Sequence, residues 1–451
     1  MLVASLGGAG CASSDADSED YLAWGGGKED GVETASPAAL ERAFPEGDSC
    51  GCANATSLLP PFGPIEDTSW KRLETDHFSV LYRTDGPDRV VASWLDLIPK
   101  DGHPDFINEV AKGAEAGYSR FIGGLGYADP GKTTIYVKDA KEFFGYENAG
   151  TVVIDNDSFA FRISRHFLRA TVAHEYFHVL QEKLAGGTWT DQDRWLTESA
   201  AVWAEQEATG LWGGFVGAFV RDAVVAGRLK QGVHESLLSN EPVFAANLGY
   251  STFLWEQFLV ERLGDPGVVK RSFELMHGGR SALSAVDDML KERGTSIEAE
   301  FREWTTWNYL VGNRDDGAHY SDGHDIFHGL TSSHVEATYK TPPADFQTTK
   351  TLPALLGANY IEFAVSSSAV TFTIDVEGEG NRLVGLSTLG KRRSDGAWIT
   401  VHHPASTTAQ SVQVDHAGQF DKIVLVVQHL IARDPSVSQR PMSYRYRATQ
   451  L

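Results

Sequence analysis

The stretch Thr171-Val-Ala-His174-Glu175-Tyr-Phe-His178-Val-Leu-Gln181 decides the fold around it and carries the clearest chemical signal in the chain. On a helix, side chains four residues apart lie one above the other, so the imidazoles of His174 and His178 can converge on one metal ion. Glu175 lies about 100° around the helix from His174, within reach of a water at the metal without being a ligand. This is the His-Glu-x-x-His zinc motif, and it predicts a metal site on a helix over residues 165–184. The alternative is a surface helix with two solvated histidines.

A second predicted helix, over residues 194–208, offers a third metal ligand. Catalytic zinc is held by three protein ligands and keeps a fourth position open. Glu198 lies in the run Trp195-Leu-Thr-Glu198-Ser-Ala-Ala-Val-Trp203-Ala-Glu205. A carboxylate among such apolar neighbours is costly unless a cation or hydrogen bonds compensate it. Because Gly186-Gly187 separates the two helices, we expect the chain to turn there and bring Glu198 back toward the histidines; an exposed helical glutamate is the alternative.

The combination of these two segments resembles the gluzincin zinc peptidases, especially the M1-type aminopeptidases and related bacterial metallopeptidases. The shared pattern is His-Glu-x-x-His followed by Trp-Leu-x-Glu-x-x-Ala-x-x-x-Glu. The resemblance implies that Zn²⁺ is bound by His174, His178 and Glu198, with Glu175 as general base. It further implies that Glu205 orients a ligand histidine, although a surface position on the helix fits the sequence about as well.

The resemblance also implies a hydrogen-bond donor for the oxyanion that forms when water attacks a peptide carbonyl. In these families the donor is a tyrosine on a later helix, and Tyr250 stands at the start of a predicted helix over residues 251–263. A buried core tyrosine is the alternative, and His234 is a weaker candidate for the same role. No Gly-x-Met-Glu-Asn motif precedes the zinc helix, so endopeptidase activity on a protein or peptide substrate is expected. Residues 151–154 are expected to form the edge strand along which an extended substrate lies.

The expected fold class is α+β, in two parts after the N-terminal segment. Residues 71–340 are predicted to form a zincin-like metallopeptidase domain, in which strands at 77–82, 133–137 and 151–154 and a helix at 104–121 precede the helical part. A looser likeness to secreted bacterial metalloproteases covers most of residues 75–320 and implies a C-terminal β-domain. Short β-rich runs at 359–365, 370–376, 398–401, 422–427 and 444–447 predict a β-sandwich over residues 341–451.

The N-terminal segment predicts where the protein is located, and the composition limits its partners. Residues 1–11 resemble a lipoprotein-type signal segment cleaved before Cys11, which would carry a lipid, and residues 12–70 read as a flexible linker or propeptide. An ordinary apolar N-terminus is the alternative. The expected product is a bacterial protein that is exported, either secreted or held at the membrane only through Cys11. The net charge of −22 argues against nucleic acid as a partner. Cys50 and Cys52 are given no catalytic role.

Two rival functions remain open at this stage. One is a zinc-binding pseudoenzyme that keeps the ligands without turnover. The other is a cell-surface binding or adhesion lipoprotein whose working part is the β-sandwich. The remaining histidines are expected to be loop residues rather than a second metal site, among them His319, His324, His328, His402 and His403.

Overall fold

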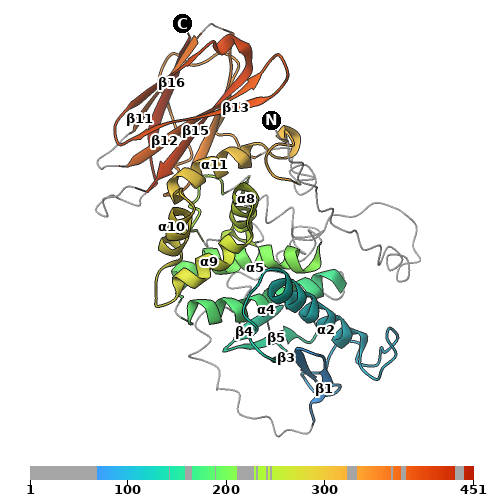
Figure 1. The fold of residues 1–451 in the computed structure, drawn as a ribbon. Coiled ribbons are helices and arrows are strands. Elements are labelled where there is room, and N and C mark those ends of the chain that lie inside the picture. The colour runs from blue at the N-terminus through green and yellow to red at the C-terminus, as the bar shows by residue number, and fades with distance from the viewer. Residues whose placement is uncertain are drawn as a thin grey trace, which may run out of the picture.

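The computed structural model describes residues 69–141, 143–157, 165–187, 189–210, 228–229, 232–239, 242–243, 246–321, 333–366, 369–376, 382–431 and 441–450. The signal segment, the linker up to residue 68, all three cysteines, His324 and His328 lie outside the described residues. The chain forms a mixed sheet, then a set of helices, then a pair of sheets, so the fold is α+β (Figure 1).

The first sheet has the strand order β1-β2-β3-β5-β4. Its strands are β1 (Lys71–Glu74), β2 (Phe78–Tyr82), β3 (Thr133–Lys138), β4 (Gly145–Asn148) and β5 (Thr151–Asp155). Strands β2, β3 and β5 are parallel, whereas β4 pairs antiparallel with β5. The expectation that residues 151–154 form an edge strand is therefore wrong. Strand β5 has a neighbour on each side, and β4 is the edge next to the helices.

Helices cover this sheet and then continue toward the C-terminal sheets (Figure 1). Helix α2 (Asp105–Tyr118) runs into a π-helical turn at Ser119–Gly124 and packs on α4 (Arg165–Ala185). The others are α5 (Arg194–Thr209), α7 (Leu248–Ser251), α8 (Phe253–Leu263), α9 (Gly267–Met276), α10 (Ala282–Glu292) and α11 (Ile297–Tyr309). The helix expected over residues 251–263 is divided at Thr252, where α7 ends and α8 begins.

The C-terminal part consists of two packed sheets with the strand orders β13-β12-β15-β10-β8 and β14-β11-β16-β9. Apolar side chains from both sheets, such as Phe363 of one and Phe372 of the other, share one core. Strand β8 already belongs to the first of these sheets, so the sheet begins a few residues before position 341. The strands are β8 (Ala337–Tyr339), β9 (Gln347–Thr348), β10 (Ala358–Ala364), β11 (Ala369–Val376), β12 (Leu383–Arg392), β13 (Trp398–Ser406), β14 (Gln410–Asp415), β15 (Phe420–Leu430) and β16 (Tyr444–Gln450).

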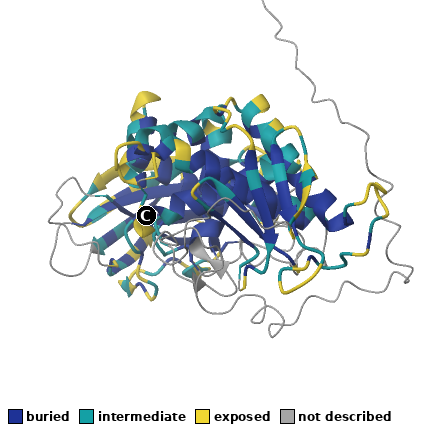
Figure 2. Ribbon diagram, turned by 90° about the horizontal axis from the view of Figure 1, so that it is seen from below, coloured by how far each residue is buried: buried dark blue, intermediate teal, exposed yellow. Residues whose placement is uncertain are grey.

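Helix α11 joins the two halves, because it lies against the sheet that contains β12 and β15. The Arg302 guanidinium donates to the backbone carbonyls of Leu386 at 2.6 Å and His403 at 2.7 Å. The Gln428 amide donates to the Thr305 hydroxyl at 2.7 Å. Buried residues run continuously through the middle of the molecule, as the dark ribbon in Figure 2 shows. The sandwich therefore packs directly against the helices and does not form a separate, freely linked domain.

Two of the histidines expected in loops belong instead to this interface. His402 and His403 lie on strand β13, and His402 Nε2 is 3.2 Å from the Glu303 carboxylate of α11. His402 Nδ1 also pairs with the Ser387 hydroxyl at 2.7 Å. His319 lies outside the helices and strands, as expected, and pairs with Asp316 at 2.8 Å.

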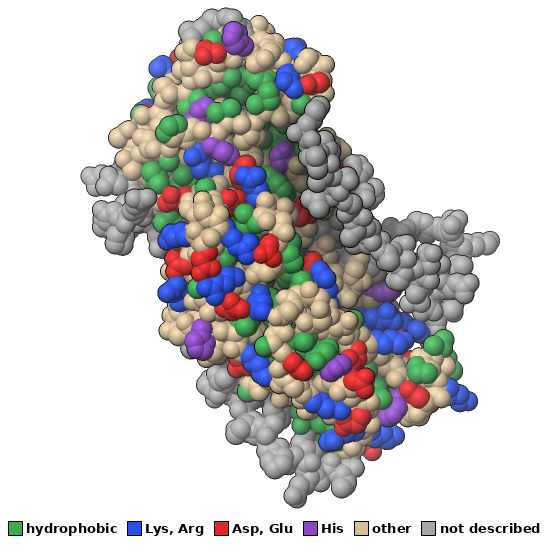
Figure 3. Space-filling model, viewed as in Figure 1, with side chains coloured by type: hydrophobic (Ala, Val, Ile, Leu, Met, Phe, Trp, Pro, Cys, Tyr) green, Lys and Arg blue, Asp and Glu red, His purple; other side chains and the backbone are tan. Residues whose placement is uncertain are grey.

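The surface over the helices carries both signs of charge (Figure 3). Arg271 of α9, for example, pairs with Glu274 and with Glu292 of α10. Among the described helices, none is both long enough and apolar enough to cross a membrane.

Candidate metal centre

Helices α4 and α5 bring the candidate ligands together. Helix α4 is buried over most of its length between α2, α5 and the sheet. The close approach of α2 depends on Gly113, where an added Cβ would lie 2.7 Å from the Arg169 backbone. After α4, Gly186 and Gly187 adopt φ values of +72° and +66°, and the chain returns as α5. Such left-handed backbone favours glycine, so this pair of residues permits the turn.

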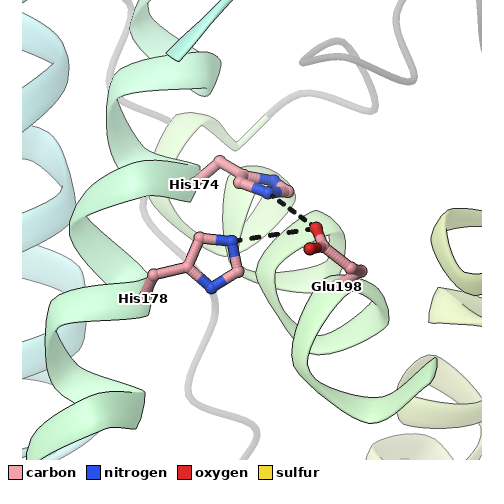
Figure 4. A group of neighbouring side chains, drawn as sticks. All are labelled: His174, His178 and Glu198. Atoms are coloured by element: carbon pink, nitrogen blue, oxygen red, sulfur yellow. Dashed lines mark ion pairs between the residues drawn. The ribbon is translucent and has the colours of Figure 1, made fainter. Parts of the chain in front are cut away.

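The three expected ligands form one buried cluster. His174 and His178 project from α4 toward Glu198 of α5 (Figure 4). Glu198 Oε2 lies 3.5 Å from His174 Nε2 and 3.8 Å from His178 Nε2. Tetrahedral zinc with bonds of about 2.0–2.1 Å places its ligand atoms roughly 3.3 Å apart. The observed spacing is close to this value, so the residues fit a metal ion.

Buried polar atoms without hydrogen-bond partners also indicate that the cluster fits a metal ion. His178 Nε2 and both carboxylate oxygens of Glu198 are buried, and none has a hydrogen-bond partner within the described residues. Buried polar atoms left without partners cost several kcal/mol as a set, roughly 1–3 kcal/mol each, so such a group calls for an explanation. A cation between the three side chains would satisfy all of these atoms together. The buried His174-His178-Glu198 group can therefore bind a metal.

The protonation states suit metal binding as well. Burial lowers the pKa of His178 to about 4, so its imidazole is neutral near neutral pH. Burial alone would raise the pKa of Glu198, but His174, His178 and Arg194 together hold it below its ordinary value. Metal ligands must be a neutral imidazole and an ionised carboxylate, and these are the forms that the site favours.

The outer nitrogens of both histidines are held by fixed partners. His174 Nδ1 lies 2.7 Å from Glu205 Oε1, and Glu205 is only 1% exposed, so it is not a surface residue of α5. His178 Nδ1 pairs at 2.7 Å with Gln181, whose amide donates to the Thr197 carbonyl at 2.9 Å. Both rings are thus oriented with Nε2 toward Glu198. The sequence reading did not single out Gln181, although its position one turn after His178 was the available signal.

Glu175 of α4 is fully buried, where α4 packs against the edge strand β4. At Gly145 of β4, an added Cβ would lie 2.9 Å from Glu175 Cγ and 3.0 Å from the Val153 carbonyl oxygen. The missing side chain of Gly145 therefore makes the space that Glu175 occupies. On the same face of β4, Glu147 has its pKa raised to about 8 by burial and by the nearby Glu182 and Glu175. Glu147 is therefore largely protonated at neutral pH, which limits the repulsion between it and Glu175.

Tyr250, but not His234, is the oxyanion candidate that the structure brings next to a ligand. The Tyr250 ring is buried in α7, with its centroid 6.2 Å from that of His174. His234 lies in a separate segment, where its Nε2 is 3.3 Å from Glu235 and its carbonyl accepts from Ala354 of the C-terminal part.

A buried acid contacts the residue that follows Glu198 in α5. Glu256 of α8 accepts a hydrogen bond from the Ser199 hydroxyl at 2.8 Å, and Ser199 is the neighbour of Glu198. Burial raises the pKa of Glu256 to about 8, so the acid is largely protonated at neutral pH. It therefore adds little charge to the site.

Comparisons with known proteins do not assign this chain to a family. No protein-family model matches it, and no curated protein matches it. The pre-peptidase C-terminal domain of a collagenase from Bacillus anthracis aligns at 12% identity over 26% of this chain and 96% of that chain, with a TM-score of 0.15. PliG, a periplasmic inhibitor of g-type lysozyme from Aeromonas hydrophila, aligns at 11% identity over 25% of this chain and 98% of that chain, with a TM-score of 0.17. Both TM-scores are too low to carry an argument.

Proposed function

We propose that this protein is a zinc-dependent peptidase with a zincin-like domain, acting as an endopeptidase on protein or peptide substrates. The observation that carries the proposal is the buried His174-His178-Glu198 cluster with Glu175 on the next position of the same helix. Three ligands that leave a fourth position open are typical of catalytic rather than structural zinc. Structural sites are usually closed by a fourth protein ligand, and within the described residues the cluster contains three.

Each residue then has a defined task. Zn²⁺ held by His174, His178 and Glu198 would supply Lewis-acid chemistry, polarising a carbonyl and lowering the pKa of a water. Glu175 would accept the proton from that water and deliver it to the leaving amine. Glu205 and Gln181 would keep the two imidazoles in the tautomer that presents Nε2 to the metal.

Tyr250 would donate a hydrogen bond to the oxyanion of the tetrahedral intermediate. Its position beside His174 supports this role, since a donor must lie next to the reacting carbonyl to stabilise the charge that develops there.

Strand β4 is the proposed docking edge for the substrate. Among the described strands it has a neighbour on one side only, and Gly145 brings it into contact with Glu175. An extended peptide that adds to this edge would lay its backbone across the metal cluster. This edge replaces residues 151–154, which lie inside the sheet. A peptide held by its backbone needs no terminus nearby, and this supports cleavage within a chain.

The proposed location is outside the cytoplasm, with lipid attachment at Cys11 or secretion. The support is the N-terminal sequence pattern alone, which lies outside the described residues.

The test is the Glu175→Gln protein, which keeps the shape of the side chain but cannot accept a proton. We expect it to bind zinc like the wild type and to lose casein cleavage by at least about 100-fold. The matched control is Glu292→Gln, the same chemical change at the exposed end of α10, which should cleave normally. Zinc binding without cleavage by the wild type would favour the pseudoenzyme, and retained cleavage by Glu175→Gln would exclude the proposed mechanism.

A further inference from the structure

We propose that the C-terminal β-sandwich is a working part of the catalytic unit, because it holds the helix junction that carries Tyr250. The link runs through the buried side chain of Arg228 to Thr252, which makes both of them positioning residues. This inference rests on the proposed peptidase function and adds to it a role for the sandwich.

The first step is a set of backbone hydrogen bonds between the sandwich and the segment 232–239. Ala354 N, in the loop before β10, donates to the His234 carbonyl at 2.8 Å, and Ala358 N, at the first residue of β10, donates to the Val233 carbonyl at 3.1 Å. In return, Leu237 N donates to the Leu356 carbonyl at 2.8 Å. Backbone bonds in both directions fix the position of the segment much as a strand pairing would.

The contact is also close-packed. At Gly357, an added Cβ would lie 2.1 Å from the His234 carbonyl oxygen, so no larger residue fits without displacing the segment. Leu356 and Leu430 of the C-terminal part belong to the same buried core as Leu229 and Leu237. Because packed cores have low compressibility, a shift of this loop is passed on to the segment rather than absorbed.

The second step is Arg228, which is only 2% exposed. Its Nη1 donates to the Ser236 carbonyl at 3.0 Å and approaches the carbonyls of Gly232 and Glu235 at 3.5 Å. Its Nη2 donates to the Thr252 hydroxyl at 2.6 Å. Burial lowers the pKa of Arg228 to about 10, which leaves the guanidinium charged at neutral pH. A buried charge is costly unless hydrogen bonds and an opposite charge compensate it, and the segment 232–239 supplies three carbonyl oxygens and the Glu235 carboxylate that do so. The position of the guanidinium therefore depends on this segment.

The third step leads from Thr252 to the metal cluster. Thr252 is fully buried at the junction of α7 and α8, where its N–H donates to the Gly249 carbonyl and its carbonyl accepts from Trp255 N. Tyr250 lies two residues earlier, with its ring beside His174. A displacement of Thr252 would therefore move the tyrosine that faces the ligands, and a misplacement of about 1 Å is enough to cost roughly 100-fold in rate.

The first experiment compares Thr252→Val with Thr252→Ser. Valine has nearly the shape of threonine but cannot accept the hydrogen bond from Arg228, whereas serine can. We expect Thr252→Val to lower kcat by roughly 10- to 100-fold at unchanged zinc content and nearly unchanged KM, and Thr252→Ser to retain most of the wild-type kcat. A raised KM with unchanged kcat in Thr252→Val would overturn the role of the hydroxyl. An equal loss of kcat in both variants would also overturn it.

The second experiment acts from the sandwich side and does not depend on how Thr252→Val folds. Gly357→Ala presses on the His234 carbonyl, so it should lower kcat although the residue belongs to the C-terminal part. The matched control is Gly390→Ala, whose Cβ would lie 2.6 Å from the Phe420 ring, inside the sandwich core. At a temperature where both proteins are folded by circular dichroism, the control should lose stability but keep its kcat. Equal kcat values for the two variants would overturn the inference.

Hydrogen exchange separates this inference from the proposed function. In Gly357→Ala, amides of residues 248–255 should exchange at least about tenfold faster than in the wild type and in Gly390→Ala. This readout needs no turnover, so it decides the coupling even if the wild type proves to be inactive. Unchanged exchange at these amides would refute the link between the sandwich and the Tyr250 junction, whatever the activity.

Discussion

The Glu256→Gln substitution should stabilise the protein, and by an amount that grows with pH. Burial raises the pKa of Glu256 from 4.5 to about 8. For an acid, a pKa raised by folding means that the folded state binds the proton more tightly than the unfolded state. The stability that protonated Glu256 contributes is fully present below pH 4.5. It is lost progressively as the pH rises from 4.5 through about 8. Glutamine resembles the protonated acid in shape and can still accept from the Ser199 hydroxyl, so it removes this loss.

The magnitude follows from the shift. Each pKa unit corresponds to about 1.4 kcal/mol, so the wild type should lose about 3 kcal/mol relative to the variant between about pH 5 and about pH 8. Urea unfolding of both proteins at the two pH values measures this difference. Glu292→Gln is the control: Arg271 lowers the pKa of Glu292, so this carboxylate is ionised at both pH values and its removal should have no comparable pH dependence. A gain in stability from Glu256→Gln that is the same at both pH values would refute the reasoning.

Three further predictions concern the site itself. Gly145→Ala should displace Glu175 and lower kcat by at least about tenfold at unchanged zinc content. The control is Gly123→Ala, where no atom of the described residues lies within 4 Å of the added Cβ, and it should cleave casein like the wild type. Glu205→Gln should weaken zinc binding by roughly 10- to 100-fold in a competition titration, because it removes the charge that orients His174; unchanged affinity would contradict that role. Chelation of the metal should lower Tm by roughly 5–10 °C in calorimetry, with recovery on adding zinc, since a ligand that binds the folded state stabilises it; no change would argue against a metal at this site.

Much of the site could be predicted from local sequence because it depends on helical spacing. The positions of His174 and His178 on one face, and of Glu198 and Glu205 on the next helix, follow from residues that lie one or two turns apart. The C-terminal ends of the helices followed from glycine signals, and α4 and α5 begin and end within a residue of expectation. The burial of Glu205 could not be read in this way, because it depends on packing between helices.

Helices α9 and α10 were missed although they carry local helical patterns. Other missed elements depend on distant partners. Strand β12 contains Gly385 and Gly390, which read as turn signals in the sequence. In the structure, an added Cβ would meet Leu430 at the first glycine and Phe420 at the second, so both mark close packing within a strand. The edge position of β4 depends likewise on its pairing with β5 and on the absence of another described neighbour, which no local pattern reveals.

The most direct test of the central claim is the zinc content of the purified protein beside that of Glu198→Ala. Glu198 is the ligand that the sequence reading inferred from context rather than from the His-Glu-x-x-His motif, and it is the residue that closes the cluster between α4 and α5. We predict about one zinc per chain in the wild type and little or none in Glu198→Ala after dialysis against a weak chelator. A wild-type protein without bound metal, or full zinc occupancy in Glu198→Ala, would contradict the account.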